Sequence, residues 1–596
     1  MLYAPSLFTY LRRPTREVRV GRIGVGGRNP VRVQSMITCD TMDTEASIAQ
    51  TLDLAAVGCE IVRITAPTVR DAANLEHIVR GLRELGCEVP IVADIHFKPD
   101  AAYEAAKWVD KVRINPGNYA DKKRFAVREY TDGEYAAELE RIREQFLPLV
   151  RLCQARGIAI RIGTNHGSLS DRIMNRYGDT PLGMVESALE FAHIARDAGY
   201  HDFVFSMKSS NPKVMIAAYR MLVARLGSEG VDWNYPIHLG VTEAGDGEDG
   251  RIKSAIGIGS LLADGIGDTI RVSLTEDSVH EIPVAQALVA SISGSGGGVA
   301  VETGTTLPWD PFSYRRRATE VMALPSASPE RALVRLGGTE VPRVVVRRAE
   351  FDRVAHKLRG LGDYQPEIVF EQAAVVEVDP RDPQAMAYLN ESAEAHLVAV
   401  ADGLDLPVIA AYRMLAYHLA ERHPILLKDS LRASTNPNTP FLQTLLTAAT
   451  NIGSLLCDGI GDAILVQGEE APGQALRLGY NVLQAAGSRI FKTDYVACPS
   501  CGRTLFNLQE TTGRIKAATV HLKGVKIAIM GCIVNGPGEM ADADFGYVGG
   551  APGKVNLYVG KTPVKFNIPE AEAVGRLTDL IREHGKWVEP AADLMI

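Results

Sequence analysis

Three cysteines near the end of the chain are spaced for chemistry. Cys498 and Cys501 enclose a Pro-Ser pair, Cys532 follows after 30 intervening residues, and Glu539 follows after six more. The other five cysteines are isolated, and eight in 596 residues are too few for a disulfide framework. Clustered thiols in such a chain indicate metal or redox chemistry in a reducing compartment.

Two kinds of centre fit this spacing. A structural zinc site needs four nitrogen or sulfur ligands, and His521 is the nearby candidate for the fourth. The alternative is a [4Fe–4S] cluster on three thiolates. Its fourth iron would take a more easily displaced oxygen ligand from Glu539, which suits it to bind a substrate oxygen. On the residues alone both centres stay open, and Glu539 is otherwise a surface carboxylate.

A second group of reactive side chains follows short apolar runs in the first half of the chain. Five of eight expected strands end in a cation, and polar residues accompany them. The cations are Arg63, Arg113, Arg161, Lys208 and Arg271, and their companions include Asn115, Asn165 and Ser273. Like charges gathered at one end of a barrel repel unless an anion lies among them, and arginine suits bidentate phosphate contacts. The pattern predicts a diphosphate or oligophosphate site, whereas any one of these cations alone would be a solvated rim charge.

Acidic and imidazole groups belong to the same strand ends. Asp94 and His96 lie in Ala-Asp-Ile-His-Phe, and Glu243 lies in Val-Thr-Glu-Ala-Gly. A carboxyl group near several cations is normally ionised. A buried Glu243 is a candidate proton donor, with bracing of an arginine as the equal alternative, and the plainer interpretation of His96 is a structural hydrogen bond.

The elements that must position these side chains alternate in type. From residue 31 to about 290, eight β-rich runs alternate with helical stretches. Each run is apolar almost to its end, as in a parallel sheet covered on both faces. Eight such units fit a closed (β/α)8 TIM barrel, whose active sites lie at the carboxyl ends of the strands. An open doubly wound sheet is the alternative.

The character of the sequence changes twice after these units. Residues 293–298, Ser-Gly-Ser-Gly-Gly-Gly, are typical of a flexible hinge, and the clustered cysteines lie beyond residue 486. We predict an α/β protein of three domains. These are a TIM-barrel substrate-binding domain over 1–298, an inserted degenerate barrel-like domain over 299–485, and a C-terminal α+β iron–sulfur domain over 486–596.

Part of the first domain recurs in the second. Residues 216–222 return as 409–415, and the Gly-Ser-Leu-Leu-x-Asp-Gly-Ile-Gly-Asp string beginning at Gly259 returns at Gly453. Two blocks in one order at nearly one offset indicate a duplicated piece of barrel. The predicted ligands do not recur: Lys208, Glu243, Arg271 and Ser273 correspond to Ala401, Leu431, Leu465 and Gln467. The copy is expected to serve packing or spacing.

The composition excludes several classes of protein. The chain is 46% hydrophobic but has no apolar run of about 18 residues, which predicts a globular protein without a membrane span. It carries 64 basic against 72 acidic residues, a net charge of −8, which gives no general attraction for nucleic acid. With no secretory or transit pattern at its start, we expect a cytoplasmic protein that binds neither membrane nor nucleic acid.

Seven motifs together resemble those of one enzyme family. They are VQSM (33–36), ADIHF (93–97), VRINPGN (112–118), GTNHGS (163–168), VTEAG (241–245), CPSCGR (498–503) and MGCIVNGPGE (530–539). The chain is similar to the 4-hydroxy-3-methylbut-2-enyl diphosphate synthases of the non-mevalonate isoprenoid pathway, in their long three-domain form. It departs from them at Cys39, where the family has small polar residues, so Cys39 has no assigned role.

The resemblance implies a reaction, a cofactor and site residues. The reaction is reductive opening of 2-C-methyl-D-erythritol 2,4-cyclodiphosphate, with two electrons passing through a [4Fe–4S] cluster from reduced ferredoxin or flavodoxin. The implied substrate-binding residues are Arg63, Arg113, Asn115, Arg161, Asn165, Lys208, Arg271 and Ser273. The implied cluster ligands are Cys498, Cys501, Cys532 and Glu539, and the implied catalytic residues are Glu243, Asp94 and His96.

Two rival interpretations and one question of assembly stay open. One rival is an aldolase- or pteroate-synthase-type barrel with a zinc module, and the other is a non-enzymatic iron–sulfur scaffold or zinc-ribbon protein. In the family's short form the cluster domain closes over the barrel between the subunits of a dimer. The sequence does not decide whether this chain closes on itself or as a homodimer.

Overall fold

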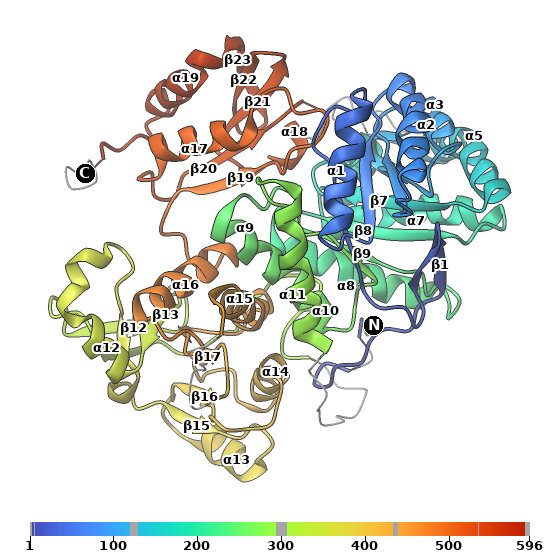
Figure 1. Ribbon diagram of the computed structural model, residues 1–596. Coiled ribbons are helices and arrows are strands. Elements are labelled where there is room, and N and C mark those ends of the chain that lie inside the picture. The colour runs from blue at the N-terminus through green and yellow to red at the C-terminus, as the bar shows by residue number, and fades with distance from the viewer. Residues whose placement is uncertain are drawn as a thin grey trace.

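The N-terminal part of the chain forms a barrel of eight parallel strands (Figure 1). The computed structural model describes residues 3–4, 6–119, 129–293, 307–432, 439–533, 536–540 and 542–590, without the side chains of residues 292, 293, 359, 537 and 539. The strands run in the order β8-β7-β6-β5-β4-β3-β10-β9, and a bridge from Phe205 to Ile237 joins the two edges. The predicted TIM barrel is therefore confirmed, and the open doubly wound sheet is excluded.

The barrel strands are short and buried, and helices surround them. The strands are β3 (Arg32–Met36), β4 (Ile61–Thr65), β5 (Ile91–Asp94), β6 (Lys111–Ile114), β7 (Ala159–Asn165), β8 (Phe203–Lys208), β9 (His238–Leu239) and β10 (Thr269–Ile270). The main helices are α1 (Thr44–Ala56), α2 (Val69–Glu84), α3 (Pro99–Ala105), α5 (Asp132–Arg156), α7 (Pro181–Asp197), α8 (Pro212–Glu229), α9 (Gly247–Ser254), α10 (Ser260–Ala263) and α11 (Glu281–Ser293). None of the helices in the described ranges is long and apolar enough to cross a bilayer.

A hairpin closes the barrel at the amino ends of its strands. Its strands are β1 (Glu17–Val20) and β2 (Ile23–Gly26), which pair antiparallel. Its buried valines, among them Val18, pack against Ile61, Val92 and Val204 inside the barrel. With this end filled by apolar side chains, the carboxyl end is left for polar groups.

The inserted domain is an incomplete second barrel. It begins with the hairpin β11 (Met322–Pro325) and β12 (Leu333–Leu336), and its parallel strands are β13 (Arg343–Val346), β14 (Ile368–Val369), β15 (Val376–Val378), β16 (Val398–Val400), β17 (Leu426–Lys428) and β18 (Ala463–Leu465). Pairings and one bridge give the order β15-β16-β17-β18-β13-β14. In the described residues β14 and β15 do not pair, so this domain has six parallel strands and an open side. The predicted degenerate barrel-like fold is confirmed.

The repeat extends beyond the two blocks of sequence described above. In the first barrel Arg12 Nη2 lies 2.9 Å from Asp268 Oδ1, and in the second Arg316 Nη2 lies 2.9 Å from Asp462 Oδ1. These arginines precede the opening hairpin of each barrel, in segments that still match at four positions: Tyr10, Arg12, Arg13 and Thr15 correspond to Tyr314, Arg316, Arg317 and Thr319. The predicted boundary at 298/299 falls outside the described residues.

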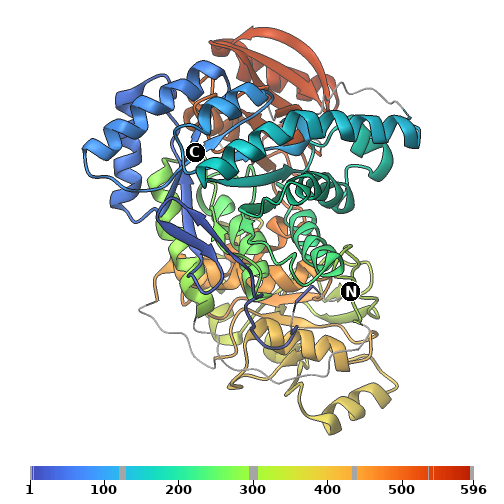
Figure 2. The same cartoon turned by 90° about the vertical axis from the view of Figure 1, so that its right-hand side faces the viewer.

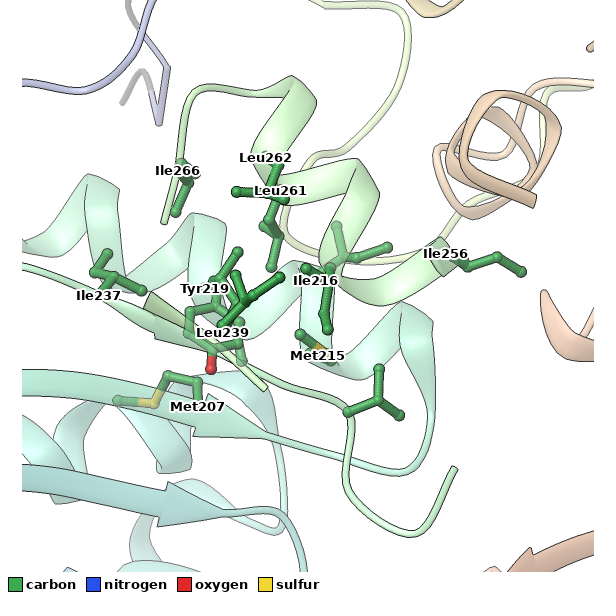
Figure 3. Packing of buried hydrophobic residues seen from close by; sticks show 14 of the residues in the cluster. Met207, Met215, Ile216, Tyr219, Ile237, Leu239, Ile256, Leu261, Leu262 and Ile266 are labelled. Carbon is green, nitrogen blue, oxygen red and sulfur yellow. The ribbon is translucent and has the colours of Figure 1, made fainter. Parts of the chain in front are cut away.

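The repeated segments supply core side chains. In Figure 3, Met215, Ile216 and Tyr219 of α8 lie among Leu261 and Leu262 of α10 and neighbouring apolar residues. These side chains are buried, so a change of volume at any of them would disturb close packing. This explains why the copy keeps these strings while losing the strand-end cations.

The two barrels pack through equivalent helices, α8 and α10 of the first and α14 (Val408–His418) and α15 (Phe441–Cys457) of the second. Arg220 lies 2.9 Å from Asp264 and 2.6 Å from Asp458. Arg413 lies 2.7 Å from Asp264 and 2.9 Å from Asp458. All four side chains are at most 2% exposed, and Ser260 and Ser454 meet at 2.6 Å beside them. Each barrel contributes one arginine and one aspartate to this buried quartet.

Substitution of Asp458 with asparagine is expected to destabilise this interface. Because the change leaves Arg220 and Arg413 sharing one buried carboxylate, we expect the free energy of unfolding to fall by about 3–5 kcal/mol. Scanning calorimetry should show a lower melting temperature. The exposed Asp405 of the same domain is the control, and an Asp458→Asn melt like that of Asp405→Asn would contradict the expectation.

The C-terminal domain is a five-stranded mixed sheet with helices. Its strands, in sheet order, are β19 (Asp494–Ala497), β20 (Lys526–Met530), β21 (Phe545–Ala551), β22 (Lys554–Val559) and β23 (Thr562–Pro569). Its helices are α17 (Leu508–Thr519), α18 (Gly536–Glu539) and α19 (Glu570–Glu583). In both views this domain lies at the top of the molecule and the inserted domain at the bottom (Figures 1 and 2).

Candidate functional site

One cavity lies between the carboxyl ends of the barrel strands and the C-terminal domain, with an empty volume of about 640 Å³. The barrel lines it with Met36, Arg63, Asp94, His96, Arg113, Asn165, Lys208, Thr242, Glu243, Arg271 and Ser273. The C-terminal domain lines it with residues 498–501, Arg503, residues 530–532 and Gly536. Residues separated by more than 400 positions thus line one cavity.

The C-terminal domain is seated on the barrel of its own chain. Ala244, in the loop after β9, bridges to Ala497 at the end of β19, and the Thr275 hydroxyl donates to the carbonyl of Cys498 at 3.0 Å. A Cβ on Gly502 would lie 2.6 Å from the Cys39 carbonyl oxygen, so only glycine allows this turn to approach so closely. The two domains are in contact on both sides of the cavity.

Arg113 is held from several directions in the cavity wall. Its Nη1 donates to Asp94 Oδ1 at 2.8 Å and lies 2.8 Å from His96 Nε2. Its Nη2 donates to the Gly163 carbonyl at 3.0 Å and to Asn165 Oδ1 at 3.2 Å. Burial alone would raise the pKa of Asp94, but Arg113 and Arg63 hold it well below the ordinary value. Asp94 is therefore an ionised carboxylate that fixes the guanidinium of Arg113.

Arg271 is braced from behind. Glu281, at the start of α11, lies 3.0 Å from Arg271 Nη2 and accepts the Ser35 hydroxyl at 2.6 Å. The sulfur of Met36 lies 2.8 Å from Arg271 Nη1 and 3.0 Å from Arg63 Nη2. A buried carboxylate and a thioether thus set the direction of two guanidinium groups.

The cations in and beneath the cavity outnumber their acid partners. We call Arg63, Arg113, Lys208 and Arg271 the cationic cradle. Burial lowers the pKa of Arg63 to about 10 against the attraction of Asp94. Burial, then Arg63 and Arg161, hold the pKa of Lys208 well below its ordinary value. An anion placed among these groups would offset the free-energy cost of burying their charges and would reduce their mutual repulsion. The cradle therefore suits a multiply charged anion.

Lys111, at the start of β6, lies still deeper in the barrel. Its ammonium group is buried and has no hydrogen-bond partner among the described residues. Burial, with Arg161 and Arg63 adding to it, lowers the pKa of Lys111 to about 7. Between pH 7 and the ordinary lysine pKa, the unfolded chain binds the proton that the folded chain does not. The destabilisation that the buried Lys111 causes is therefore complete below pH 7, and it decreases as the pH rises toward the ordinary lysine pKa.

Substitution of Lys111 with methionine, which has a similar volume, is expected to raise the melting temperature. The gain should be at least about 2 °C below pH 7 and should shrink toward pH 10 as the wild-type lysine becomes neutral. Thermal melts at several pH values measure it. The exposed Lys554→Met variant is the control, and a gain independent of pH would contradict the assignment to Lys111.

His96 is enclosed beside Asp94 at 3.5 Å. Burial, then Arg503, lowers the pKa of His96 to about 3 despite the nearby carboxylate. The imidazole is therefore neutral at neutral pH, and its Nδ1 has no partner within the part of the chain that the structure describes. In this state it is a hydrogen-bonding group rather than a proton donor to a substrate.

Glu243 reaches the cavity from a strained backbone. Its φ is +49°, in the left-handed region that side chains rarely adopt, and its carboxylate accepts the hydroxyl of Thr242. Ser500, on the facing turn, has a φ of +64°. Such strain persists where surrounding contacts enforce it and often accompanies function. The two strained residues line the cavity from opposite domains.

The three clustered cysteines all line the cavity. Burial, then Glu243 and the thiols of Cys501 and Cys532, holds the pKa of Cys498 well above its ordinary value. The three thiols therefore influence one another electrostatically, and thiolates are the ligands that iron–sulfur clusters use. No group of three or more His, Cys, Asp or Glu side chains suited to a metal ion is found in the described ranges. The side chain of Glu539 lies outside them.

Most of the predicted site residues meet in this cavity. Those that line it are Arg63, Asp94, His96, Arg113, Asn165, Lys208, Glu243, Arg271, Ser273, Cys498, Cys501 and Cys532. Two do not. Arg161 lies deeper, where its Nη1 donates to the Ser206 hydroxyl at 2.7 Å, and Asn115 accepts the backbone N–H of Gly117.

Sequence reasoning missed several lining residues. Met36 and Thr242 belong to quoted motifs but are not of types that signal a site, and Arg503 was included only as the last letter of its motif. The signal for Arg503 was its position two residues after Cys501, because a turn that brings the predicted cysteine ligands to a site brings their sequence neighbours close to it as well.

Comparisons with known proteins agree with this geometry. The GcpE TIM-barrel domain matches residues 15–286, and the GcpE protein C-terminal domain matches residues 494–583. Among solved structures, the dihydropteroate synthase of Thermus thermophilus aligns with a TM-score of 0.31 and 16% identity, over 47% of this chain and 100% of that one. A similarity this low carries no inference.

Full-length relatives carry one name. A protein of Akkermansia muciniphila named 4-hydroxy-3-methylbut-2-en-1-yl diphosphate synthase (flavodoxin) is 59% identical over 99% of each chain. A protein of Leptospira interrogans with the same name is 45% identical, again over 99% of each. The resemblance found in the motifs is confirmed. Because the relatives match throughout and the two matched domains supply the two walls of the cavity, this chain belongs to the 4-hydroxy-3-methylbut-2-en-1-yl diphosphate synthase family.

Proposed function

We propose that the protein reductively opens 2-C-methyl-D-erythritol 2,4-cyclodiphosphate to (E)-4-hydroxy-3-methylbut-2-enyl diphosphate, in isoprenoid biosynthesis by the non-mevalonate pathway. The observation that carries the proposal is the single cavity with the cationic cradle on one wall and three cysteine thiols on the other. Reduced flavodoxin, which the names of the relatives mention, or ferredoxin would supply the electrons.

The cradle would hold the diphosphate. Arg63, Arg113, Lys208 and Arg271 would contact its oxygens, with Asn165 and Ser273 as hydrogen-bonding partners. Arg161 and Asn115 would act from behind the cavity wall. Ring opening breaks a carbon–oxygen bond and leaves negative charge on a diphosphate oxygen, and fixed cations stabilise such a charge as it develops.

The thiolates of Cys498, Cys501 and Cys532, with the carboxylate of Glu539, would hold a [4Fe–4S] cluster. The donor set fits this group, since three thiols that influence one another line the wall facing the cradle. When bound, the cluster supplies two electrons, one at a time. Those electrons and one proton convert the cyclic diphosphate into the linear product and water.

Glu243 would donate the proton to the departing hydroxyl, which leaves as water. Its place between the cradle and Cys498 supports this role, as does the strained backbone that holds it there. Asp94 and His96 would act as positioning residues, because both contact Arg113 and neither carries a proton available at neutral pH.

The inserted domain over 299–485 would be structural, and catalysis would need one chain. Its strand-end charges pair internally, with Lys428 lying 2.6 Å from Glu377 and 2.7 Å from Asp402. Such pairing leaves little attraction for an anion. The contacts of residues 486–596 with the barrel of the same chain support closure without a second subunit, so a homodimer would not be required.

The test is anaerobic turnover of the reconstituted protein. With the cyclic diphosphate and reduced flavodoxin, we expect a linear diphosphate, which ³¹P NMR and mass spectrometry identify. No product from protein with a complete iron and sulfide content would overturn the proposal.

A further inference from the structure

We infer that Arg503, which the C-terminal domain carries into the cavity, is a fifth cation of the anion site and couples anion binding to domain closure. This inference rests on the proposed function. It concerns a residue of the cysteine-bearing domain, whereas the cationic cradle belongs to the barrel alone.

Arg503 lies where the two domains face each other. It lines the same cavity as Arg63 and Arg113. The preceding residue is Gly502, whose close approach to the Cys39 carbonyl seats the turn on the barrel. The backbone that carries Arg503 is therefore fixed against the barrel, and its side chain enters from the side opposite the cradle.

The charges around Arg503 come from both domains. In its own domain Arg503 hydrogen-bonds to the side chain of Cys501, and on the barrel side it faces the carboxylate of Asp94. Arg503 also lowers the pKa of Arg63 and His96. The guanidinium thus lies within electrostatic reach of the cradle, and it remains charged at any working pH.

Part of the hydrogen-bonding capacity of Arg503 is not used within the described residues. Its Nε and Nη1 are buried, and neither has an acceptor there. Arg271 contrasts with it, because Glu281 accepts from both Nε and Nη2 of that residue. Buried N–H groups of a cation without acceptors are costly, and oxygens of a bound anion would satisfy them.

This placement has a thermodynamic consequence. When the C-terminal domain moves off the barrel, Arg503 leaves with it and the anion site keeps only the barrel cations. An anion that contacts Arg503 therefore binds the closed arrangement more tightly than the open one and favours closure by the same factor. In this way substrate binding would bring the cysteine-bearing wall over the substrate.

The test measures binding of the cyclic diphosphate to oxidised, reconstituted holoenzyme without reductant. Arg503→Gln is compared with Arg514→Gln, which changes an exposed arginine on α17 of the same domain. We expect the Kd of Arg503→Gln to rise about tenfold to a hundredfold, the range for losing a charged hydrogen bond. Arg503→Lys, which keeps the charge, should bind with intermediate affinity. Hydrogen exchange of residues 498–504 should slow when ligand is added to the wild-type protein, but less in Arg503→Gln.

Iron and sulfide contents are measured first, so that an effect on the cofactor is seen separately. An altered cluster content with unchanged affinity would assign Arg503 to the cysteines alone and overturn the inference. Equal affinity of Arg503→Gln and Arg514→Gln for the cyclic diphosphate would also overturn the inference. In that case the proposed function would still stand if the wild-type protein converted the substrate. A wild-type protein that neither binds nor converts the cyclic diphosphate would remove the proposed function, and this inference with it.

Discussion

The Cys532→Ser variant is expected to lose its iron–sulfur cluster and at least about 1000-fold in turnover, the scale on which a catalytic unit fails when one member is removed. Cys532 lines the cavity and influences the ionisation of Cys498, so its sulfur belongs to the same group of thiols. The predicted cluster has three cysteine ligands, so this substitution would leave it with two. Serine has nearly the same shape, so the fold should survive.

Iron and acid-labile sulfide after anaerobic purification measure this effect. The wild-type chain should contain about four of each, as a [4Fe–4S] cluster requires. Cys39→Ser is the matched control, since Cys39 lies in the loop against Gly502 and its sulfur contacts Ser47 at 3.6 Å. The control should keep the cluster. Stoichiometric zinc without sulfide in the wild-type protein would contradict the assignment of the cysteines.

The Glu243→Gln variant is expected to lower kcat by about 100- to 10,000-fold, the range for a general acid, while KM changes little. Glutamine keeps the size of the side chain and the contact with Thr242 but has no proton to donate to the departing hydroxyl. Because Glu243 is not part of the cationic cradle, anion binding should persist. The loss should therefore appear in kcat.

Steady-state rates with reduced flavodoxin and a measured cluster content test this expectation. Glu84→Gln, at an exposed position of α2, is the control. If Glu243 only braces an arginine, KM should rise and kcat should hold. That result would contradict the proton-donor role and would support the alternative that Glu243 only holds an arginine in place.

The strand-end side chains were predictable because the barrel strands are apolar almost to their last residues. Lys208 is the last residue of its strand, and Arg63 and Arg113 lie within two residues of the ends of theirs, at positions that the fold brings to one rim. Arg161 follows the same pattern, yet it lies beneath the rim and donates to Ser206. Strand tilt decides the layer in which a side chain lies, and tilt depends on how all eight strands close.

The second barrel shows which segments of the first were retained and for what physical reason. The strings around Ile216 and Gly259 recur because their side chains fill the core, where volume is constrained. The segments before the opening hairpins recur for a different reason: Arg12 and Thr15 contact Asp268 as Arg316 and Thr319 contact Asp462. Side chains that make specific polar contacts are thus retained together with those that fill the core.

The order of residue types along the chain determined the barrel, its incomplete copy and the two sets of reactive groups, since strand periodicity, core strings and cysteine spacing are local properties. The tertiary structure decided which groups share one space: it seated residues 494–503 on the barrel of the same chain, directed Arg503 toward the cradle and left Arg161 behind the wall. These contacts join residues hundreds of positions apart, and their geometry depends on the packing of whole domains, which no local pattern of residues encodes.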